Sequence, residues 1–331
     1  MVEKRRLGKT DREITPIGLG CWQFSEGAGM SGRFWEPIGQ ESINAIVGAA
    51  LKGGIGWFDT AEGYGNGRSE QALAAALRAN NVAPGDVVIA TKWSPFFRTA
   101  RSIGETIGTR TSSLGEYPID LYQVHNPMSF SPIPAQMREM TKLLRAGTVR
   151  AVGVSNFTAR QMEQAHAALA AEGIVLASNQ VRFNLLHRRI ERTGVLEAAK
   201  RLGITIIAWS PLAQGVLTGR FHDEPKQIGK LSRMRRLMGR LSPAGLARTA
   251  PLIEELREVA RAHGASVAQV ALSWAVSFHG DTVVAIPGAS RPAQAEQSAG
   301  AMGLRLSEKE LARIDELSLQ VQAGQPAAVG R

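Results

Sequence analysis

The sequence contains very little cysteine: Cys21 is the only one among 331 residues. A single thiol excludes an intrachain disulfide, so a reducing compartment is expected. The segment 1–6 lacks the apolar core of a signal peptide. No run approaches the roughly 18 to 20 apolar residues that are needed to cross a bilayer. We therefore expect a cytoplasmic protein with no membrane partner.

The sequence also lacks the glycine pattern of a Rossmann dinucleotide fold. Gly-x-Gly-x-x-Gly after a strand would indicate that fold, but the nearest match, at 18–23, has no third glycine. The segment 63–67 fails the same spacing. There is no low-complexity tract, internal repeat or linker. These absences favour one domain over 1–331, with 322–331 as a flexible tail.

Acidic residues are fewer than basic ones, 29 against 39, which gives a net charge of +10. The excess lies at 182–248, where 14 Lys and Arg accompany 4 Asp and Glu. Such a block can indicate nucleic-acid or membrane binding, but no recognised nucleic-acid motif accompanies it. We interpret most of these charges as solvated surface and a few as attracting cofactor phosphates. No nucleic-acid partner is expected.

Short apolar runs alternate with amphipathic stretches along the chain. The candidate strands are 17–20, 57–59, 87–91, 121–124, 149–154, 177–180, 205–209 and 282–286. Helical periodicity lies between them, for example at 42–52, 69–80, 133–145, 159–171, 190–201 and 266–277. This alternation is typical of parallel βα units. The predicted fold is an α/β protein, a (β/α)8 TIM barrel.

Three segments depart from a minimal barrel. The polar segment 6–16 is expected to form an N-terminal β-hairpin that closes one end. The segment 215–243, after the seventh strand, is too long for an ordinary loop, and we expect a short basic helix at 230–241. Ser-Glu-Lys-Glu at 307–310 is typical of a capping box and predicts an extra C-terminal helix over 310–318.

Four chemically useful side chains stand at or near the ends of predicted strands. Asp59, Lys92 and His125 each follow an apolar run, and Tyr64 stands five residues after the first of them. Parallel barrel strands all deliver their carboxyl ends to one face, so these four residues are expected to converge. A phenol has an ordinary pKa of about 10, and a nearby ammonium lowers it and eases proton transfer to a carbonyl oxygen. Each residue alone has an ordinary structural explanation, so the prediction rests on their joint spacing.

The sequence resembles the aldo-keto reductases from about residue 6 to about residue 317. Five of that family's motifs occur in their usual order, at 56–67 (GWFDTAEGYGNG), 89–92 (IATK), 120–125 (DLYQVH), 153–157 (GVSNF) and 208–221 (AWSPLAQGVLTGRF). The motifs are most similar to those of the bacterial reductases and of the potassium-channel β-subunit-like branch.

The resemblance implies a role for each of the four residues. Tyr64 would be the general acid, Lys92 and Asp59 its tuning pair, and His125 the group that orients the substrate. In the oxidative direction Tyr64 would act as base. Glu62, beside Tyr64, is interpreted as an ordinary loop residue.

A cofactor is also required, because no protein side chain donates hydride. The resembled family binds a nicotinamide cofactor at the barrel mouth without the Rossmann pattern. The resemblance implies that amide and hydroxyl groups hold the carboxamide, that an indole stacks on the ring, and that a tight loop wraps the pyrophosphate. The implied cofactor residues are Cys21, Trp22, Asp59, Ser155, Asn156, Gln180, Trp209, Ser210, Pro211, Leu212, Gln214, Gly215, Leu217, Arg220, Gly288, Ser290, Arg291, Gln294, Gln297 and Ser298.

The adenosine end of that site bears on the choice of cofactor. Ser290 and Arg291 supply a hydroxyl and a guanidinium suited to a 2′-phosphate, so NADPH is expected and NADH is less favoured. The alternative for Arg291 is a solvated first-turn charge. Gln297 and Ser298 stand where the family commonly carries Glu-Asn, and the shorter Ser298 is the weaker of the two.

The expected substrate contacts are Trp22, Tyr64, Trp93 and His125, with Trp57 and 96–97 as weaker candidates for an apolar pocket. The leading hypothesis is a metal-free, NADPH-dependent oxidoreductase that reduces a small-molecule aldehyde or ketone to an alcohol. Two alternatives stay open. One is an NAD(P)-dependent dehydrogenase of a sugar or polyol, and the other is a cofactor-binding regulatory subunit similar to channel β subunits. The sequence selects neither the substrate nor the oligomeric state.

Overall fold

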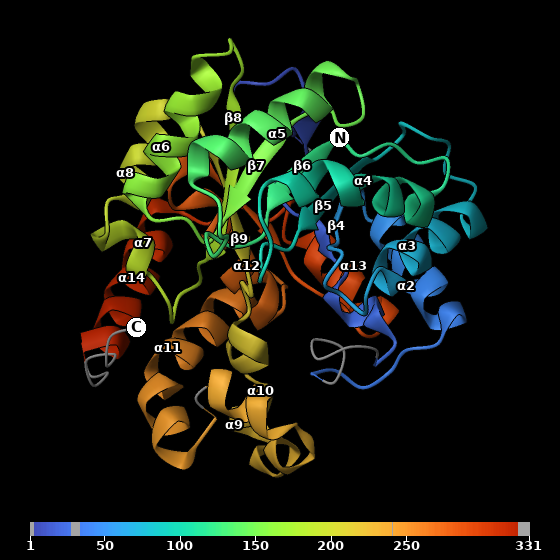
Figure 1. The fold of residues 1–331 in the computed structure, drawn as a ribbon. Helices are drawn as coiled ribbons and strands as arrows, with labels where there is room; N and C mark the ends of the chain where they lie inside the picture. The colour runs from blue at the N-terminus through green and yellow to red at the C-terminus, as the bar shows by residue number, and fades with distance from the viewer. Residues whose placement is uncertain (1–2, 28–33, 240, 324–331) are drawn as a thin grey trace.

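The computed structural model describes residues 3–27, 34–239 and 241–323, and its centre is a parallel sheet (Figure 1). The strands are β3 (Leu19–Gly20), β4 (Trp57–Asp59), β5 (Val88–Trp93), β6 (Leu121–Val124), β7 (Val152–Ser155), β8 (Leu176–Arg182), β9 (Thr205–Trp209) and β10 (Val283–Ile286). The eight strands pair in chain order. Backbone bridges from Ile17 to Ala285 and from Gly20 to Gly288 join the first strand to the last. The sheet therefore closes on itself, and the predicted barrel is confirmed.

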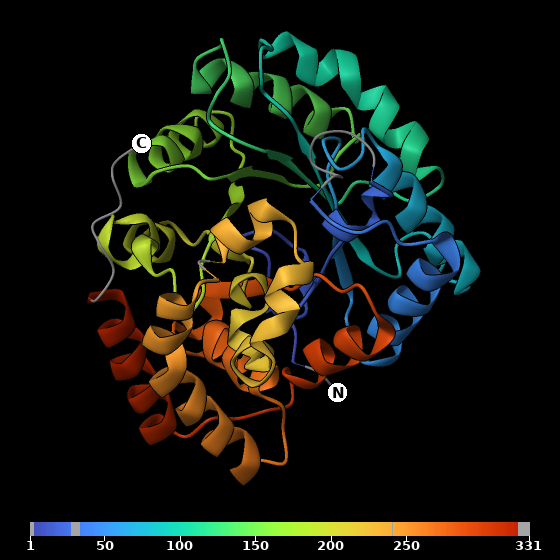
Figure 2. The same ribbon diagram turned by 90° about the horizontal axis from the view of Figure 1, so that it is seen from below.

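Helices surround this barrel (Figures 1 and 2). Those that follow the strands in turn are α2 (Gln40–Lys52), α3 (Arg68–Ala79), α4 (Arg101–Leu114), α5 (Ile133–Arg145), α6 (Ala159–Ala170), α7 (Arg189–Arg192), α8 (Val195–Leu202), α12 (Val267–Ser277) and α13 (Pro292–Gly300). A single helix was expected over 190–201, but Gly194, with a φ of 74°, separates α7 from α8. Helix α4 is not among the helices expected from the sequence.

An antiparallel hairpin, β1 (Arg5–Arg6) with β2 (Glu13–Ile14), lies at one end of the barrel, as predicted. The backbone N–H of Gly8 donates to Thr205 Oγ1 at 2.7 Å, at the amino-terminal end of β9. The hairpin therefore closes the end opposite the carboxyl ends of the strands.

Apolar side chains fill the barrel interior next to the hairpin. They are Leu7, Ile14, Trp57, Ala90, Leu121, Ala151, Ala177, Ile207, Val284 and Ile286. The Trp57 indole N–H donates to the Thr15 carbonyl at 2.9 Å. Trp57 therefore belongs to the apolar layer next to the hairpin, and the prediction that it lines a substrate pocket is wrong.

The segment between β9 and α11 (Pro243–Ala262) is long, as expected, but it is divided differently. It contains η2 (Ala213–Thr218), α9 (Arg220–Asp223), η3 (Pro225–Lys230) and α10 (Arg233–Met238). The expected helix over 230–241 begins later because Ser232, with a non-helical ψ of 150°, caps α10 by accepting from the Arg235 N–H. Figure 2 shows this segment in front of the barrel.

The last helix, α14 (Glu308–Ala323), is longer than the predicted 310–318. The predicted capping box is present, since Ser307 N–H donates to Glu310 Oε2 at 2.7 Å and Glu310 N–H donates to Ser307 Oγ at 3.3 Å. The expected tail 322–331 is wrong at its first two residues, which are helical, and its remainder lies outside the described residues. No helix within the described residues is long and apolar enough to cross a membrane.

Candidate active site

The ends of three neighbouring strands bring the predicted residues together. Lys92, on β5, donates from Nζ to Asp59 Oδ1 at 2.5 Å and to the Thr60 carbonyl at 2.7 Å. The Lys92 ammonium lies 4.9 Å from the centre of the Tyr64 ring. The His125 ring, just after β6, is 5.7 Å from the Tyr64 ring and steeply inclined to it, at 79°. The four residues therefore converge at the carboxyl ends of the strands.

A layer of amides surrounds the buried Asp59 carboxylate. Asp59 Oδ2 accepts hydrogen bonds from Gln180 Nε2 at 2.8 Å and from Gln123 Nε2 at 3.2 Å. One donor of the Gln180 amide is thus engaged within the protein. The sequence interpretation missed Gln123, although an amide within the apolar run of β6 is a detectable irregularity.

The charges of this group follow from burial and proximity. Burial acts to lower the pKa of Lys92, but Asp59 and Tyr64 outweigh it, and the pKa rises above 10.5. Burial raises the pKa of the Tyr64 phenol above 10, while the Lys92 charge opposes that rise. The expected net lowering of the Tyr64 pKa is therefore wrong for this structure. Tyr64 holds its proton beside a permanent cation.

His125 is neutral. Burial, assisted by the charge of Lys92, lowers the pKa of His125 to about 3. The side chain is only partly exposed and faces the cavity described below. A neutral imidazole carries one N–H, so His125 can donate one hydrogen bond without carrying charge.

Asn156 connects the far side of the site. Trp209 Nε1 donates to Asn156 Oδ1 at 3.1 Å, and Asn156 Nδ2 donates to the His125 carbonyl at 3.2 Å. Ser155 Oγ donates to the Gln180 carbonyl at 2.9 Å. Asn156 has a φ of 61°, a conformation that asparagine tolerates better than most residues. The indole of Trp209 is therefore held beside the catalytic group by β7 and β8.

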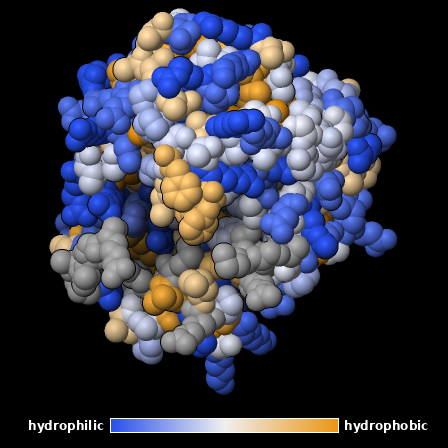
Figure 3. Space-filling view, viewed as in Figure 1, coloured by the Kyte–Doolittle hydropathy of each residue, from blue (hydrophilic) through white to orange (hydrophobic). Residues whose placement is uncertain are grey.

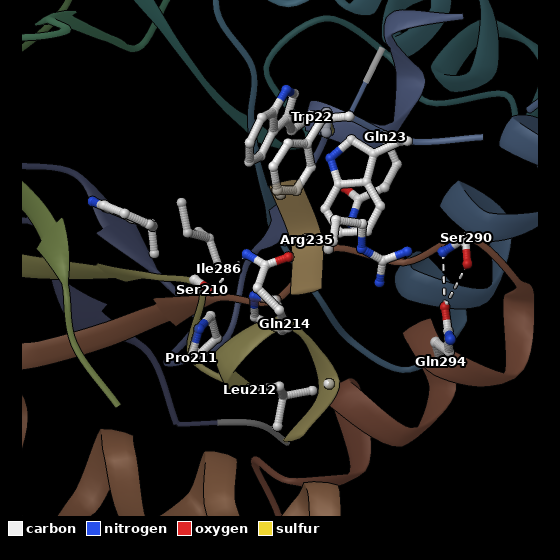
Figure 4. Close-up of a pocket in the computed structure, with 18 of the residues that line it drawn as sticks. Trp22, Gln23, Ser210, Pro211, Leu212, Gln214, Arg235, Ile286, Ser290 and Gln294 are labelled. Atoms are coloured by element: carbon white, nitrogen blue, oxygen red, sulfur yellow. Dashed lines mark hydrogen bonds between the residues drawn. The ribbon is translucent and has the colours of Figure 1, made fainter. Parts of the chain in front are cut away.

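A cavity of about 1680 Å³ opens above these residues (Figure 4). Its walls include almost every predicted site residue: Cys21, Trp22, Asp59, Tyr64, His125, Ser155, Asn156, Gln180, Trp209, Ser210, Pro211, Leu212, Gln214, Gly215, Arg220, Gly288, Ser290, Arg291, Gln294, Gln297 and Ser298. Lys92 acts from beneath the wall and is wholly buried.

Two predicted contacts lie outside the cavity wall. Trp93 is 0% exposed, and its indole N–H donates to Ser102 Oγ at 3.1 Å. It packs on the outer side of β5 toward α4, so the expected substrate contact is wrong. Leu217 is also 0% exposed and belongs to the hydrophobic core, so it supports the loop rather than touching a ligand.

The loop after β9 has an unusual backbone. Ser210, Ala213, Gln214 and Gly215 have φ angles of 54°, 48°, 59° and 96°. Only glycine adopts such angles without strain. A Cβ at Gly215 would lie 3.3 Å from a guanidinium nitrogen of Arg220, so the loop packs closely on that side chain. Strained loops of this kind are concentrated at ligand sites.

The cavity wall beyond this loop fits a large anion. Burial lowers the pKa of Arg220, and the neighbouring charge of Arg291 lowers it further. Burial and then Arg220 lower the pKa of Arg235 to about 10. Among the described residues, Nε of Arg220 and of Arg235 has no hydrogen-bond partner. The charge of Arg220 is repelled by those of Arg291 and Arg235, and the unpaired Nε groups of Arg220 and Arg235 suit the phosphates of a dinucleotide.

The turn before α13 borders the same part of the cavity. Gly288 packs against the Gln23 side chain, whose amide nitrogen would lie 2.1 Å from a Cβ at this position. Ser290 N–H donates to Gln294 Oε1 at 2.8 Å (Figure 4), which holds the turn before α13. The helix begins directly after Arg291, where its free amides favour an anion.

Four cavity residues were not anticipated from the sequence: Gln23, Phe34, Trp35 and Arg235. Phe34 stacks on the predicted Trp22 at 4.6 Å, and the Arg235 guanidinium lies 4.2 Å from the Trp35 ring centre. These side chains come from the loop after β3 and from α10. Only the aromatic content of the loop and the basic content of α10 could have indicated them.

Glu62 is not the ordinary loop residue that the sequence interpretation made it. It is 6% exposed, and its carboxylate pairs with Arg98 at 2.7 Å and with Arg110 at 2.6 Å. The backbone N–H of Ser94 donates to the same carboxylate at 2.5 Å. Glu62 is therefore a buried anchor for the Tyr64 loop.

A closed barrel with this constellation at its mouth defines a class of oxidoreductases that act on carbonyl and alcohol groups. The aldo/keto reductase family model matches residues 16–319, and the chain belongs to that family. The chain is 36% identical over 324 residues to an uncharacterized oxidoreductase of Mycobacterium tuberculosis, covering 96% of this chain and 93% of the relative. It is 30% identical to the chloroplastic pyridoxal reductase of Arabidopsis thaliana, covering 91% of this chain and 82% of the relative.

Solved structures have the same architecture. The glycerol dehydrogenase AKR11B4 from Gluconobacter oxydans aligns with a TM-score of 0.80 and 26% identity, over 99% of this chain and 98% of that one. An aldo-keto reductase from Klebsiella pneumoniae in complex with NADPH aligns with a TM-score of 0.71 and 26% identity, over 96% of each chain.

Proposed function

We propose that this protein reduces an aldehyde or a ketone to an alcohol with NADPH, and that Tyr64 donates the proton. The buried Lys92–Asp59 pair, whose ammonium lies 4.9 Å from the Tyr64 ring, carries the proposal. When bound, the reduced nicotinamide supplies hydride to the carbonyl carbon. Tyr64 gives its proton to the carbonyl oxygen, and Lys92 stabilises the phenolate that is left. His125 donates a hydrogen bond to the same oxygen and orients it.

The choice of NADPH rests on the charges of the cavity. Ser155, Asn156 and Gln180 would hold the carboxamide, and Trp209 would stack on the ring. Arg291, at the start of α13, would pair with a 2′-phosphate. The aldo-keto reductase from Klebsiella pneumoniae was solved in complex with NADPH, which supports this choice.

Tyr64→Phe tests the proton donor. We expect turnover of benzaldehyde to fall by about 10² to 10⁴, because general acid catalysis contributes on that order. The Kd for NADPH, measured by fluorescence titration, should change less than about twofold, since phenylalanine preserves the ring. Wild-type turnover in this variant would remove Tyr64 from the mechanism.

A second candidate is an alcohol dehydrogenase of a polyol, which the same four groups could serve in reverse. The glycerol dehydrogenase of Gluconobacter oxydans supports it. Initial rates with NADPH on benzaldehyde and pyridoxal, compared with NADP⁺ or NAD⁺ on glycerol and sorbitol, separate the two. We expect the carbonyl substrates to have the higher kcat/KM. Higher values for the polyols, with tighter binding of NAD than of NADP, would favour the dehydrogenase.

A further inference from the structure

The inner face of α4 contains a charge where the helical period calls for an aliphatic residue. Its buried residues are Ile103, Ile107, Arg110 and Leu114. Arg110 is only 5% exposed. A buried guanidinium loses hydration, and apolar replacements at such places are often neutral or stabilising. Packing alone therefore does not account for an arginine at this position.

Arg110 bridges two carboxylates on either side of Tyr64 along the chain. Its Nη1 lies 2.6 Å from Glu62 Oε2, and its Nε lies 2.8 Å from Glu70 Oε2. Glu62 precedes Tyr64 by two positions, and Glu70 is in the first turn of α3. A Cβ on the intervening Gly67 would lie 3.3 Å from Arg110 Nη2, so the loop itself rests on the guanidinium.

The same two carboxylates accept hydrogen bonds from β5 and from the residue after it, on either side of Lys92. Glu70 Oε1 accepts from Thr91 Oγ1 at 2.6 Å, and Glu62 Oε1 accepts from the Ser94 N–H at 2.5 Å. The Glu62 N–H donates to the Lys92 carbonyl at 3.3 Å. Helices α3 and α4 contact each other beside these strands (Figure 1). One guanidinium thus connects the segment that carries the phenol to the strand that carries the ammonium.

We propose that Arg110 is a positioning residue, which holds the Tyr64 loop against β5 and so fixes the phenol beside the Lys92 ammonium. This inference rests on the proposed function of Tyr64. Arg110 does not line the cavity, and it acts through its ion pairs with Glu62 and Glu70. A displacement of about 1 Å between reacting groups can cost on the order of 10² in rate, so a rigid connection has catalytic value.

The test removes the bridge without leaving an unpaired charge. In Arg110→Met with Glu70→Gln, Glu62 keeps Arg98 as its partner, and methionine continues the apolar stripe of α4. The matched control is Arg101→Met with Glu105→Gln, an exposed ion pair on the same helix. Arg110→Lys is the conservative variant, because it keeps the positive charge. Its single ammonium cannot span both carboxylates as the guanidinium does. All are measured as full-length chains, at pH 8 except for the titration of Tyr64.

Four quantities are measured: the thermal midpoint, the Kd for NADPH, the kcat and KM for benzaldehyde, and the titration of Tyr64. The sequence has only three tyrosines, so ¹³Cζ-tyrosine NMR resolves Tyr64 once Tyr64→Phe identifies its signal. The Tyr64 titration needs no substrate. It separates the position of the phenol from the stability of the fold.

In the double variant we expect kcat to fall about 10- to 100-fold, with KM and the Kd for NADPH changed less than about twofold. The Tyr64 titration should move to higher pH as Lys92 loses its fixed place beside the ring. Arg110→Lys should recover part of kcat, and the control pair should match the wild type.

Wild-type kcat and Tyr64 titration in the double variant would overturn the proposal. So would a loss of kcat that only follows loss of the fold and of NADPH binding. If the single variant Tyr64→Phe keeps full turnover, the proposed function of Tyr64 fails. The titration of Tyr64 in the Arg110 variants still decides whether Arg110 positions the phenol.

Discussion

At the mouth of the barrel, three neighbouring ionisable side chains hold three different protonation states. Lys92 is a cation because Asp59 compensates its burial, and Tyr64 keeps its proton because burial disfavours the phenolate. His125 is neutral because both burial and the Lys92 charge oppose a second cation. Tyr64 can therefore donate a proton, and the fixed charge of Lys92 can stabilise the phenolate that remains.

The neutrality of His125 predicts a particular pH dependence. Its pKa is lowered from 6.5 to about 3, so the imidazole is deprotonated throughout the range from about pH 5 to pH 8. We expect no inflection from His125 in the pH profile of kcat over that range. His125→Gln, which keeps a hydrogen-bond donor, should lower kcat about tenfold and leave the shape of the profile unchanged. An inflection near pH 6.5 in the wild type that disappears in this variant would contradict the assignment.

The convergence of Asp59, Tyr64, Lys92 and His125 could be predicted from the sequence because each stands at or near the end of a strand, where the fold fixes its direction. The position of Arg235 in the cavity wall could not, since α10 follows no barrel period. The prediction that Trp93 contacts the substrate was wrong because side chains alternate along a strand. A residue that follows the catalytic lysine on the same strand points to the opposite side, away from the cavity.

Between elements, the contacts of α4 explain a buried charge that the sequence did not indicate. Its inner stripe contains only three apolar residues, because Arg110 takes the fourth place. The role of Glu62 was missed because its partner Arg110 lies on this distant helix.

Glu70, which connects α3 to β5 and α4, predicts how the stability of the fold varies with pH. Burial raises its pKa from 4.5 to about 7, against the opposing effects of Arg110 and Thr91. Between pH 4.5 and 7 the folded chain holds more of this proton than the unfolded chain does. The contribution of Glu70 to the free energy of unfolding therefore falls as pH rises through that interval.

Chemical unfolding of wild type and Glu70→Gln at pH 5 and pH 8 measures this contribution. The wild type should lose about 1–3 kcal/mol relative to the variant between the two pH values. Glu105→Gln, on the exposed face of α4, is the control and should show no such change. A constant difference between wild type and Glu70→Gln would show that the Glu70 carboxyl titrates normally.

Over the whole molecule, the basic excess is used in more than one way. Arg188 is buried and pairs with Glu191 at 2.8 Å and with Asp315 at 2.5 Å, so it is structural rather than solvated. Arg220 and Arg235 face the cavity. The face shown in Figure 3 is mostly hydrophilic, with apolar side chains in small groups. Composition alone could count these charges but could not separate the buried structural arginine from those that line the cavity.

The closed sheet was predictable because strands and helices alternate over the whole chain, and because parallel strands need covering helices on the outside. One part of the cavity wall was less predictable. Phe34 and Trp35, from the loop after β3, and Arg235, from the segment after β9, lie on segments that follow no period and are distant in the chain. Trp35 and Arg235 meet only because the barrel brings these segments to the same end.

The hairpin beneath the barrel determines the side from which a ligand can reach the strand ends. Among the described residues, β1, β2 and the apolar layer above them cover the amino-terminal end of the strands, and the cavity lies at the carboxyl-terminal end. A nicotinamide cofactor and a carbonyl compound would therefore both approach from the cavity side.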